Sequence, residues 1–204
     1  MIQGFGNVGS YAALELHQYG LKVIAVSDHT GALHDAGGLD IPALTHHAGR
    51  HGSIAGFSNL LAFDPEQILT LPCDVLVPAA MERVIDAEVA ENLKCRVLAE
   101  GANGPTTPDA DLVLEKRQDE IFVLPDILCN SGGVIVSYFE WVQDLQSFFW
   151  SETEVMDKLF RIMEGAFGPT LAMSRKEKIS MRAAALSLGI KRVADAKKIR
   201  GLFP

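Results

Sequence analysis

The chain opens with MIQGFGNVGS, residues 1–10, and this stretch decides the fold. Gly4, Gly6 and Gly9 form a G-x-G-x-x-G pattern, which is typical of a strand-to-helix turn that binds the pyrophosphate of a dinucleotide. The three glycines permit the tight turn, the close approach of the backbone to the phosphates and the close packing of helix on strand. Unpaired N–H groups at the start of the helix favour an anion. Because glycine-rich turns are common, the residues that follow must decide whether the pattern is functional.

The next residues have the spacing that dinucleotide binding requires. Residues 11–17 predict a helix that ends at Gly20, and residues 22–27 form a short apolar run that predicts a second parallel strand. Asp28 follows this run, 19 positions after Gly9. In dinucleotide-binding folds an acid about 20 residues beyond the glycines binds the adenosine ribose. An ordinary acid at the start of a loop is the alternative, but the joint spacing of glycines, strand and acid favours dinucleotide binding.

Strands and helices alternate through the first two thirds of the chain. Residues 29–38 read as a polar loop, and Asp40 predicts the cap of a helix with Pro42 in its first turn. Further strands are expected at 73–78, 95–99 and 121–124, with helices at 86–93 and 108–117 between them. This order predicts an α/β fold: a Rossmann-like, doubly wound, mostly parallel sheet with helices on both faces, followed by long C-terminal helices. We expect a dinucleotide-binding core over 1–133 and a helical part over 134–204, with helices at 152–174 and 176–200.

Polar loops follow three of the expected strands and contain Ala79, Asn103 and Asn130. In a doubly wound sheet, ligands bind beyond the carboxyl ends of the strands, so these residues are candidates to line one cleft. An asparagine side chain suits a carboxamide because it offers a donor and an acceptor together. Each asparagine alone also fits an ordinary turn residue.

The helix that starts near residue 134 carries a serine on an apolar face. Val134, Ser137 and Trp141 share that face at spacings of three and four residues. The Ser137 hydroxyl either bonds back to a carbonyl one turn earlier or binds something outside the helix. Aromatic residues are dense here, which indicates either core packing or an interface.

Composition excludes several classes of protein. A formal charge of −8 argues against nucleic-acid binding, and no apolar run is long enough to cross a membrane. Three scattered cysteines fit reduced thiols in a cytoplasmic protein. His46, His47 and His51 lack accompanying ligands, so we expect no metal site.

Six segments together resemble a known family: GFGNVGS (4–10), AVSDHTGAL (25–33), CDVLVPAA (73–80), AEGANGPTTPDAD (99–111), LPDILCNSGGVIVSYFEWVQD (124–144) and RAAALSLGIKRVADAKKIRGLFP (182–204). They are similar, in order, to the carboxyl-terminal, nucleotide-binding half of glutamate dehydrogenase, in the Glu/Leu/Phe/Val dehydrogenase family. The resemblance implies oxidative deamination of L-glutamate to 2-oxoglutarate and ammonia with NAD as cofactor, NADP being possible. Asp28 should repel a 2′-phosphate, although some members with an acid here use NADP, which His29 or Thr30 would then help to bind.

The resemblance also implies roles for individual residues. The implied cofactor-binding residues are Gly4, Phe5, Gly6, Asn7, Val8, Gly9, Asp28, Ala79, Asn103 and Asn130. Val134 and Ser137 match substrate-binding positions, with the Ser137 hydroxyl bonding the distal carboxylate of glutamate. The family's catalytic lysine and aspartate belong to an amino-terminal domain whose motifs do not occur here, so we expect no catalytic residue in this chain.

The resemblance bears on the extent and assembly of the protein as well. Only three residues precede Gly4, which predicts that the chain begins inside its first strand and is a carboxyl-terminal fragment without turnover of its own. The full-length protein is expected to be a homo-hexamer. A non-catalytic dinucleotide-binding or regulatory module is the alternative, and a methyltransferase with a glycine-rich turn is a poorer one.

Overall fold

The computed structural model describes residues 1–58 and 62–201. The chain divides into two compact units, Met1–Asp126 and Ile127–Pro204. The boundary proposed from the sequence, after residue 133, falls inside the second unit.

The first unit contains one seven-stranded sheet, in the order β4-β3-β2-β1-β5-β6-β7. The strands are β1 (Ile2–Gln3), β2 (Ala25–Asp28), β3 (Gly31–His34), β4 (Ala62–Phe63), β5 (Cys73–Pro78), β6 (Cys95–Ala99) and β7 (Phe122–Leu124). Strand β1 pairs in parallel with β2 and β5, and β6 and β7 continue the parallel part. The expected α/β fold with a mostly parallel sheet is confirmed.

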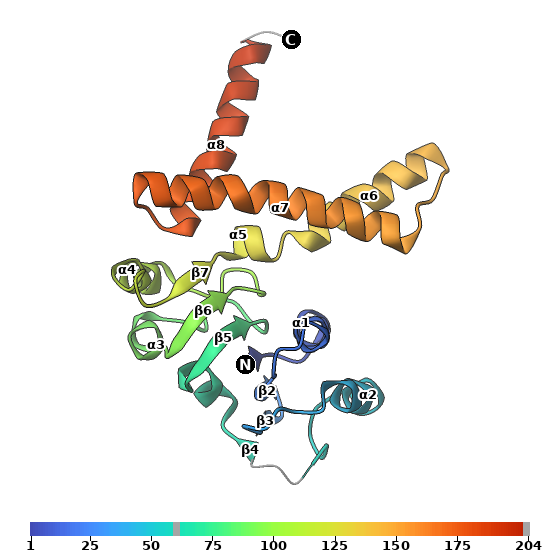
Figure 1. Ribbon diagram of the computed structural model, residues 1–204, viewed down its shortest axis with the longest axis vertical. Coiled ribbons are helices and arrows are strands. Elements are labelled where there is room, and N and C mark those ends of the chain that lie inside the picture. Colours follow the sequence, from blue (N-terminus) through green and yellow to red (C-terminus); the bar gives the residue numbers. More distant parts are fainter. Residues whose placement is uncertain (59–61, 202–204) are drawn as a thin grey trace. The chain divides into compact units, whose positions relative to one another are not determined.

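Two layers of helices cover the two faces of this sheet (Figure 1). The helical elements of the first unit are α1 (Asn7–Gln18), α2 (Ile41–His51), the 3₁₀ helix η1 (Pro65–Thr70), α3 (Ala87–Asn92) and α4 (Pro108–Lys116). Side chains of α1 and α2 pack in one apolar cluster, and those of η1, α3 and α4 pack in the other. Met1 belongs to one cluster and Ile2 to the other, because successive side chains of a strand point to opposite faces.

Aspartate side chains cap the starts of α2 and α3, and the cap at Asp40 was expected from the sequence. The Asp40 carboxylate accepts a hydrogen bond from Ala43 N at 3.0 Å, and the Asp86 carboxylate accepts one from Val89 N at 2.9 Å. Gly20 follows α1 with φ of +82°, a conformation that glycine adopts without strain.

The expected loop over residues 29–38 is wrong for residues 31–34. Residues 31–34 form β3, which pairs antiparallel with β2, and β4 pairs antiparallel with β3. Only His29 and Thr30 separate β2 from β3, and a two-residue connection is typical of a β-hairpin. Ala32 and Leu33 are buried, so this hairpin extends the core.

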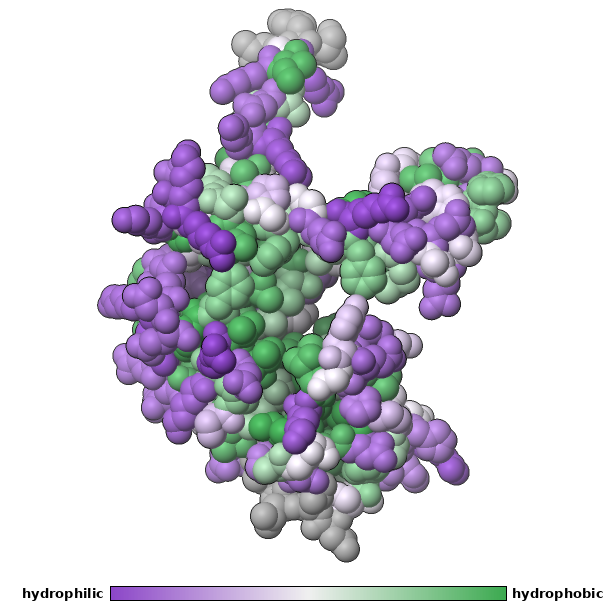
Figure 2. Space-filling model, viewed as in Figure 1, coloured by the Kyte–Doolittle hydropathy of each residue, from purple (hydrophilic) through white to green (hydrophobic). Residues whose placement is uncertain are grey.

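The second unit is helical and contains α6 (Gly132–Gln146), α7 (Glu152–Glu177) and α8 (Met181–Arg200), preceded by the short α5 (Asp126–Cys129) at the boundary. The break between the last two helices lies later than expected. Helix α7 continues to Glu177, where Lys178 adopts a left-handed conformation, and Ser180 caps α8 through Ala183 N. Figure 2 shows apolar surface on this unit, including the end of α6, and its exposed members include Trp141, Phe148 and Phe149.

Candidate functional site

The glycine-rich turn closes tightly against the ends of its neighbouring strands. Gly4 has φ of +94°, and a Cβ there would lie 2.8 Å from Ala79 O. A Cβ on Gly9 would lie 1.9 Å from Gly4 O, which no side chain permits. Gly4 N donates to Ser27 O at 2.9 Å, and Ala79 N donates to Gln3 O at 2.7 Å. Both glycines are therefore required by packing between the turn, α1 and β5.

Gly6 differs, because a Cβ there would meet no atom within 4 Å. It is the N-cap of α1, makes no side-chain cap, and is followed by a first turn without acidic residues. The first intrahelical hydrogen bond runs from Ser10 N to Gly6 O, so the helix presents its earlier N–H groups at an open surface. These features fit an anionic ligand such as a pyrophosphate.

Asp28 ends β2 beside this turn, and its carboxylate is held in place. Oδ1 accepts hydrogen bonds from Thr30 N at 2.7 Å and from the Thr30 hydroxyl, and Oδ2 accepts one from Ile54 N at 2.8 Å. A carboxylate has about four acceptor positions, so it can accept a further bond from a ligand hydroxyl. Sequence reasoning missed Ile54, which is distant in sequence and carries no polar side chain.

The loop that contains Asn103 lies against the same strand ends. Gly101 N and Ala102 N both donate to Pro78 O, at 3.0 and 2.9 Å. Asn103 is exposed on this loop, and Ala79 is half-buried beside Gly4. The structure thus brings together the glycine-rich turn, Asp28, Ala79 and the Asn103 loop at the carboxyl edge of the sheet.

A fully buried carboxylate, Glu100, organises this loop and was not found from the sequence. Its Oε1 accepts from the Thr106 hydroxyl at 2.6 Å, and its Oε2 accepts from Asp126 N at 2.8 Å. Asp126 in turn accepts from Gly104 N at 2.8 Å. The sequence signal for this buried carboxylate was an acid directly after an apolar strand, with a threonine in the following loop.

The other three expected site residues belong to the second unit. Asn130 is half-buried in the turn between α5 and α6, where the Ser131 hydroxyl donates to Leu128 O at 2.9 Å. Val134 and Ser137 are exposed on α6, at a spacing that gives them one helix face. Their roles remain predictions.

Other reactive side chains do not form a further centre in the part of the chain that the structure describes. Among residues 1–58 and 62–201 no group of three His, Cys, Asp or Glu side chains is arranged to hold a metal ion. His47 instead contacts His51 ring to ring and lies 2.8 Å from Ala55 O through Nε2. Burial raises the pKa of Cys73 and raises that of Cys95 to about 11, so both thiols are poor nucleophiles at neutral pH. No described helix combines the length and apolar character needed to span a bilayer.

Comparison with known proteins decides the family. The family model for glutamate/leucine/phenylalanine/valine dehydrogenase matches residues 1–201. The chain belongs to this dehydrogenase family.

Relatives within the family are named glutamate dehydrogenases. The chain is 48% identical to glutamate dehydrogenase of Thermotoga maritima over 100% of its own length and 49% of the relative. It is 45% identical to an NAD-specific glutamate dehydrogenase of Staphylococcus aureus, covering 98% of this chain and 48% of that protein. The chain therefore spans about half the length of the curated relatives it matches.

Solved structures of the family have the same fold. A hetero-hexameric glutamate dehydrogenase from Thermus thermophilus, in a leucine-bound form, matches all of this chain and 48% of its own, with a TM-score of 0.88 and 32% identity. Glutamate dehydrogenase from Peptoniphilus asaccharolyticus matches 99% of this chain and 47% of its own, with a TM-score of 0.81 and 35% identity. The resemblance to one half of glutamate dehydrogenase is confirmed.

Proposed function

We propose that this chain is the nucleotide-binding half of an NAD-dependent glutamate dehydrogenase, which deaminates L-glutamate oxidatively to 2-oxoglutarate and ammonia. One observation carries the proposal. The open helix start at Gly6 and the fixed Asp28 carboxylate follow two paired parallel strands, β1 and β2, at the carboxyl edge of the sheet. The printed names of the relatives support the substrate and the cofactor.

In this proposal each group of residues has a separate task. The N–H groups of Asn7, Val8 and Gly9 bind the pyrophosphate, with Gly4 and Phe5 shaping the turn. Asp28 accepts a hydrogen bond from the adenosine ribose. Ala79 and Asn103 orient the nicotinamide ring and its ribose. Asn130, in the second unit, has the same task by the family resemblance. NAD, when bound, would supply the hydride acceptor for the oxidation of the substrate α-carbon.

Val134 and Ser137 bind the substrate side chain in the proposed enzyme. The two residues lie exposed at neighbouring positions on α6, which leaves both available to a ligand. The Ser137 hydroxyl donates to the distal carboxylate of glutamate. The lysine and aspartate that transfer protons come from outside this chain, so the chain alone does not turn over.

Asp28 should set the preference for NAD. A 2′-phosphate would be repelled by its carboxylate, whose orientation Thr30 and Ile54 fix.

Calorimetric titration of the chain should give tighter binding of NAD than of NADP. Asp28→Ser should weaken NAD binding about tenfold, the cost of one hydrogen bond to a charged group, while Asp195→Ser on the exposed surface of α8 should not. Equal or tighter binding of NADP by the unmodified chain would assign the residues His29 and Thr30 to the 2′-phosphate instead.

The complete enzyme is proposed to be a cytoplasmic homo-hexamer. The exposed apolar side chains of the second unit support assembly, because a surface with Trp141, Phe148 and Phe149 exposed is typical of an interface. Nucleic acid and membranes are not among the proposed partners.

Reconstitution tests the enzyme directly. The chain would be mixed with a separately expressed amino-terminal half of the Thermotoga maritima relative, and glutamate-dependent reduction of NAD would be followed by absorbance. We expect no reduction by either half alone and measurable reduction by the mixture. Turnover by this chain alone would contradict the prediction that it contains no catalytic residue. NAD binding without any turnover in the mixture would favour the alternative, a non-catalytic dinucleotide-binding or regulatory module.

A further inference from the structure

The loop that contains Asn103 has its backbone fixed on both sides of that residue. Before it, the amides of residues 101 and 102 donate to Pro78 O, and after it, Ile85 N donates to Pro105 O at 2.9 Å. Asn103 itself is exposed. An exposed polar side chain on an ordered backbone suits ligand binding, because little conformational freedom is lost when the ligand arrives.

Gly104, the residue directly after Asn103, is held from two directions. Its N–H donates to Asp126 Oδ2 at 2.8 Å, and its carbonyl accepts from Arg83 N at 2.8 Å. Gly104 has φ of +52° and Arg83 has φ of +59°, a conformation that is uncommon for residues other than glycine. Because the Gly104 N–H and the Asn103 carbonyl belong to one peptide group, the Asp126 carboxylate fixes the peptide plane next to the Asn103 Cα.

The Asp126 carboxylate is placed by a buried anchor. Asp126 N donates to Glu100 Oε2 at 2.8 Å, and Glu100 is fully buried. Strands β6 and β7, which lead to these two acids, pair in parallel, and Glu100 N donates to Leu124 O at 3.0 Å. The sheet therefore fixes the Asp126 backbone, and the Asp126 side chain connects that fixed point to the loop that contains Asn103.

We propose that Asp126 is a positioning residue, which holds Asn103 in the orientation that binds the nicotinamide half of NAD. Asp126 acts through Gly104 N and not by contact with the cofactor. The inference rests on the proposed function, in which Asn103 orients the nicotinamide ring and its ribose. A loop that is ordered before binding costs less entropy to immobilise, so Asp126 raises the affinity for NAD without a contact of its own.

Two ligands separate positioning from general damage to the site. ADP carries the adenosine and the pyrophosphate of NAD but lacks the nicotinamide ring and its ribose. Asp126→Ala removes the carboxylate and keeps Asp126 N for Glu100, whereas Asp126→Asn retains an oxygen that accepts from Gly104 N. Asp119→Ala, at an exposed position in the turn after α4, is the control for the loss of one negative charge. Calorimetric titration would measure the dissociation constants of NAD and ADP for each chain.

Asp126→Ala should weaken NAD binding about threefold to fivefold, up to the net worth of one hydrogen bond, and change ADP binding by less than about twofold. Loss of a negative charge alone favours an anionic ligand, so weaker NAD binding comes from lost positioning. Asp126→Asn and Asp119→Ala should bind NAD as the unmodified chain does. Asn103→Ala should weaken NAD binding about fivefold, and adding Asp126→Ala to it should cause no further loss.

Unchanged NAD binding by Asp126→Ala would overturn the inference. Equal losses for NAD and ADP would overturn it too, because the substitution would then disturb the whole site. A loss in the double variant equal to the sum of the two single losses would also overturn it, since Asp126 would then act independently of Asn103. In these three cases the unmodified chain binds NAD and the proposed function stands. Absence of NAD binding by the unmodified chain would instead overturn the proposed function, and the inference with it.

Discussion

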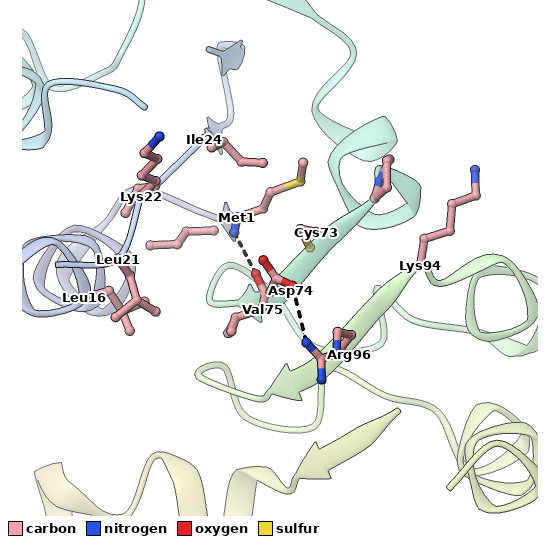
Figure 3. Close-up of a pocket in the computed structure, with 13 residues that line it drawn as sticks. Met1, Leu16, Leu21, Lys22, Ile24, Cys73, Asp74, Val75, Lys94 and Arg96 are labelled. Atoms are coloured by element: carbon pink, nitrogen blue, oxygen red, sulfur yellow. Dashed lines mark hydrogen bonds and ion pairs between the residues drawn. The ribbon is translucent and has the colours of Figure 1, made fainter. Parts of the chain in front are cut away.

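The two ends of β1 are built in opposite ways. At its carboxyl end, Gly4 and Gly9 fit against backbone atoms so closely that no side chain is tolerated, and the neighbouring strands supply hydrogen bonds. At its amino end, this two-residue strand borders a cavity of about 750 Å³ (Figure 3), and the Met1 ammonium donates to Val75 O at 2.7 Å. The carboxyl end of β1, which is proposed to bind the cofactor, is therefore closely packed, whereas its amino end borders a cavity with mostly apolar walls.

Substitution of Gly9 at the carboxyl end of β1 should cause the largest loss of stability. Gly9→Ala places a Cβ 1.9 Å from Gly4 O, so either the turn or α1 must move. We expect a loss of about 3 kcal/mol or more in the free energy of unfolding, measured by urea denaturation. That loss is a large part of the total stability of a typical domain.

Gly6→Ala is the matched control within the same turn. Its Cβ meets no protein atom, so stability should change by no more than about 0.5 kcal/mol, while NAD binding should weaken because the methyl group occupies the proposed pyrophosphate site. Similar stability losses in both variants would contradict the assignment of Gly9 to packing and Gly6 to ligand space.

Much of the carboxyl end could be predicted from the sequence, because its signals are local. The glycine spacing, the acid at Asp28 and the strands at 73–78 and 95–99 are read from neighbouring residues, and both strands have those bounds in the structure. The β2–β3 hairpin was missed because β3 offers only Ala32 and Leu33 as apolar signals and depends on pairing with β2. Glu100 was missed because burial of a carboxylate is decided by partners up to 26 residues away.

Glu100 therefore offers a second test of how the carboxyl end is held. Glu100→Gln replaces one accepting oxygen with an NH₂ group. The remaining oxygen can still accept from Asp126 N, while the NH₂ group donates to the Thr106 hydroxyl, which rotates to accept. We expect about 2 kcal/mol of lost stability, since two hydrogen bonds to a charged group become weaker bonds between neutral groups. Glu91→Gln, at an exposed position of α3, serves as the control and should be close to neutral.

Hydrogen exchange would locate the effect of Glu100→Gln. Amide protons of residues 101–104 and of Thr106 should exchange faster in the variant, because the carboxylate no longer fixes the loop that carries Asn103. An unchanged exchange rate together with unchanged stability would show that the hydrogen bonds to Pro78 O and to Asp126 hold this loop without the Glu100 carboxylate.

The smallest expected effect concerns the amino end, where burial lowers the pKa of the Met1 amine below its usual value near 8.0. Between the lowered pKa and about pH 8, the unfolded chain carries a proton on this amine more often than the folded chain does. The free energy of unfolding should therefore rise with pH through that window, and urea denaturation at pH 6, 7 and 8 would measure the rise. Acetylation of the Met1 amine removes the titrating group, so the acetylated chain should show a shallower rise. Identical slopes in the two chains would mean that the Met1 amine is hydrated in solution, and the contrast between the two ends of β1 would then rest on the cavity alone.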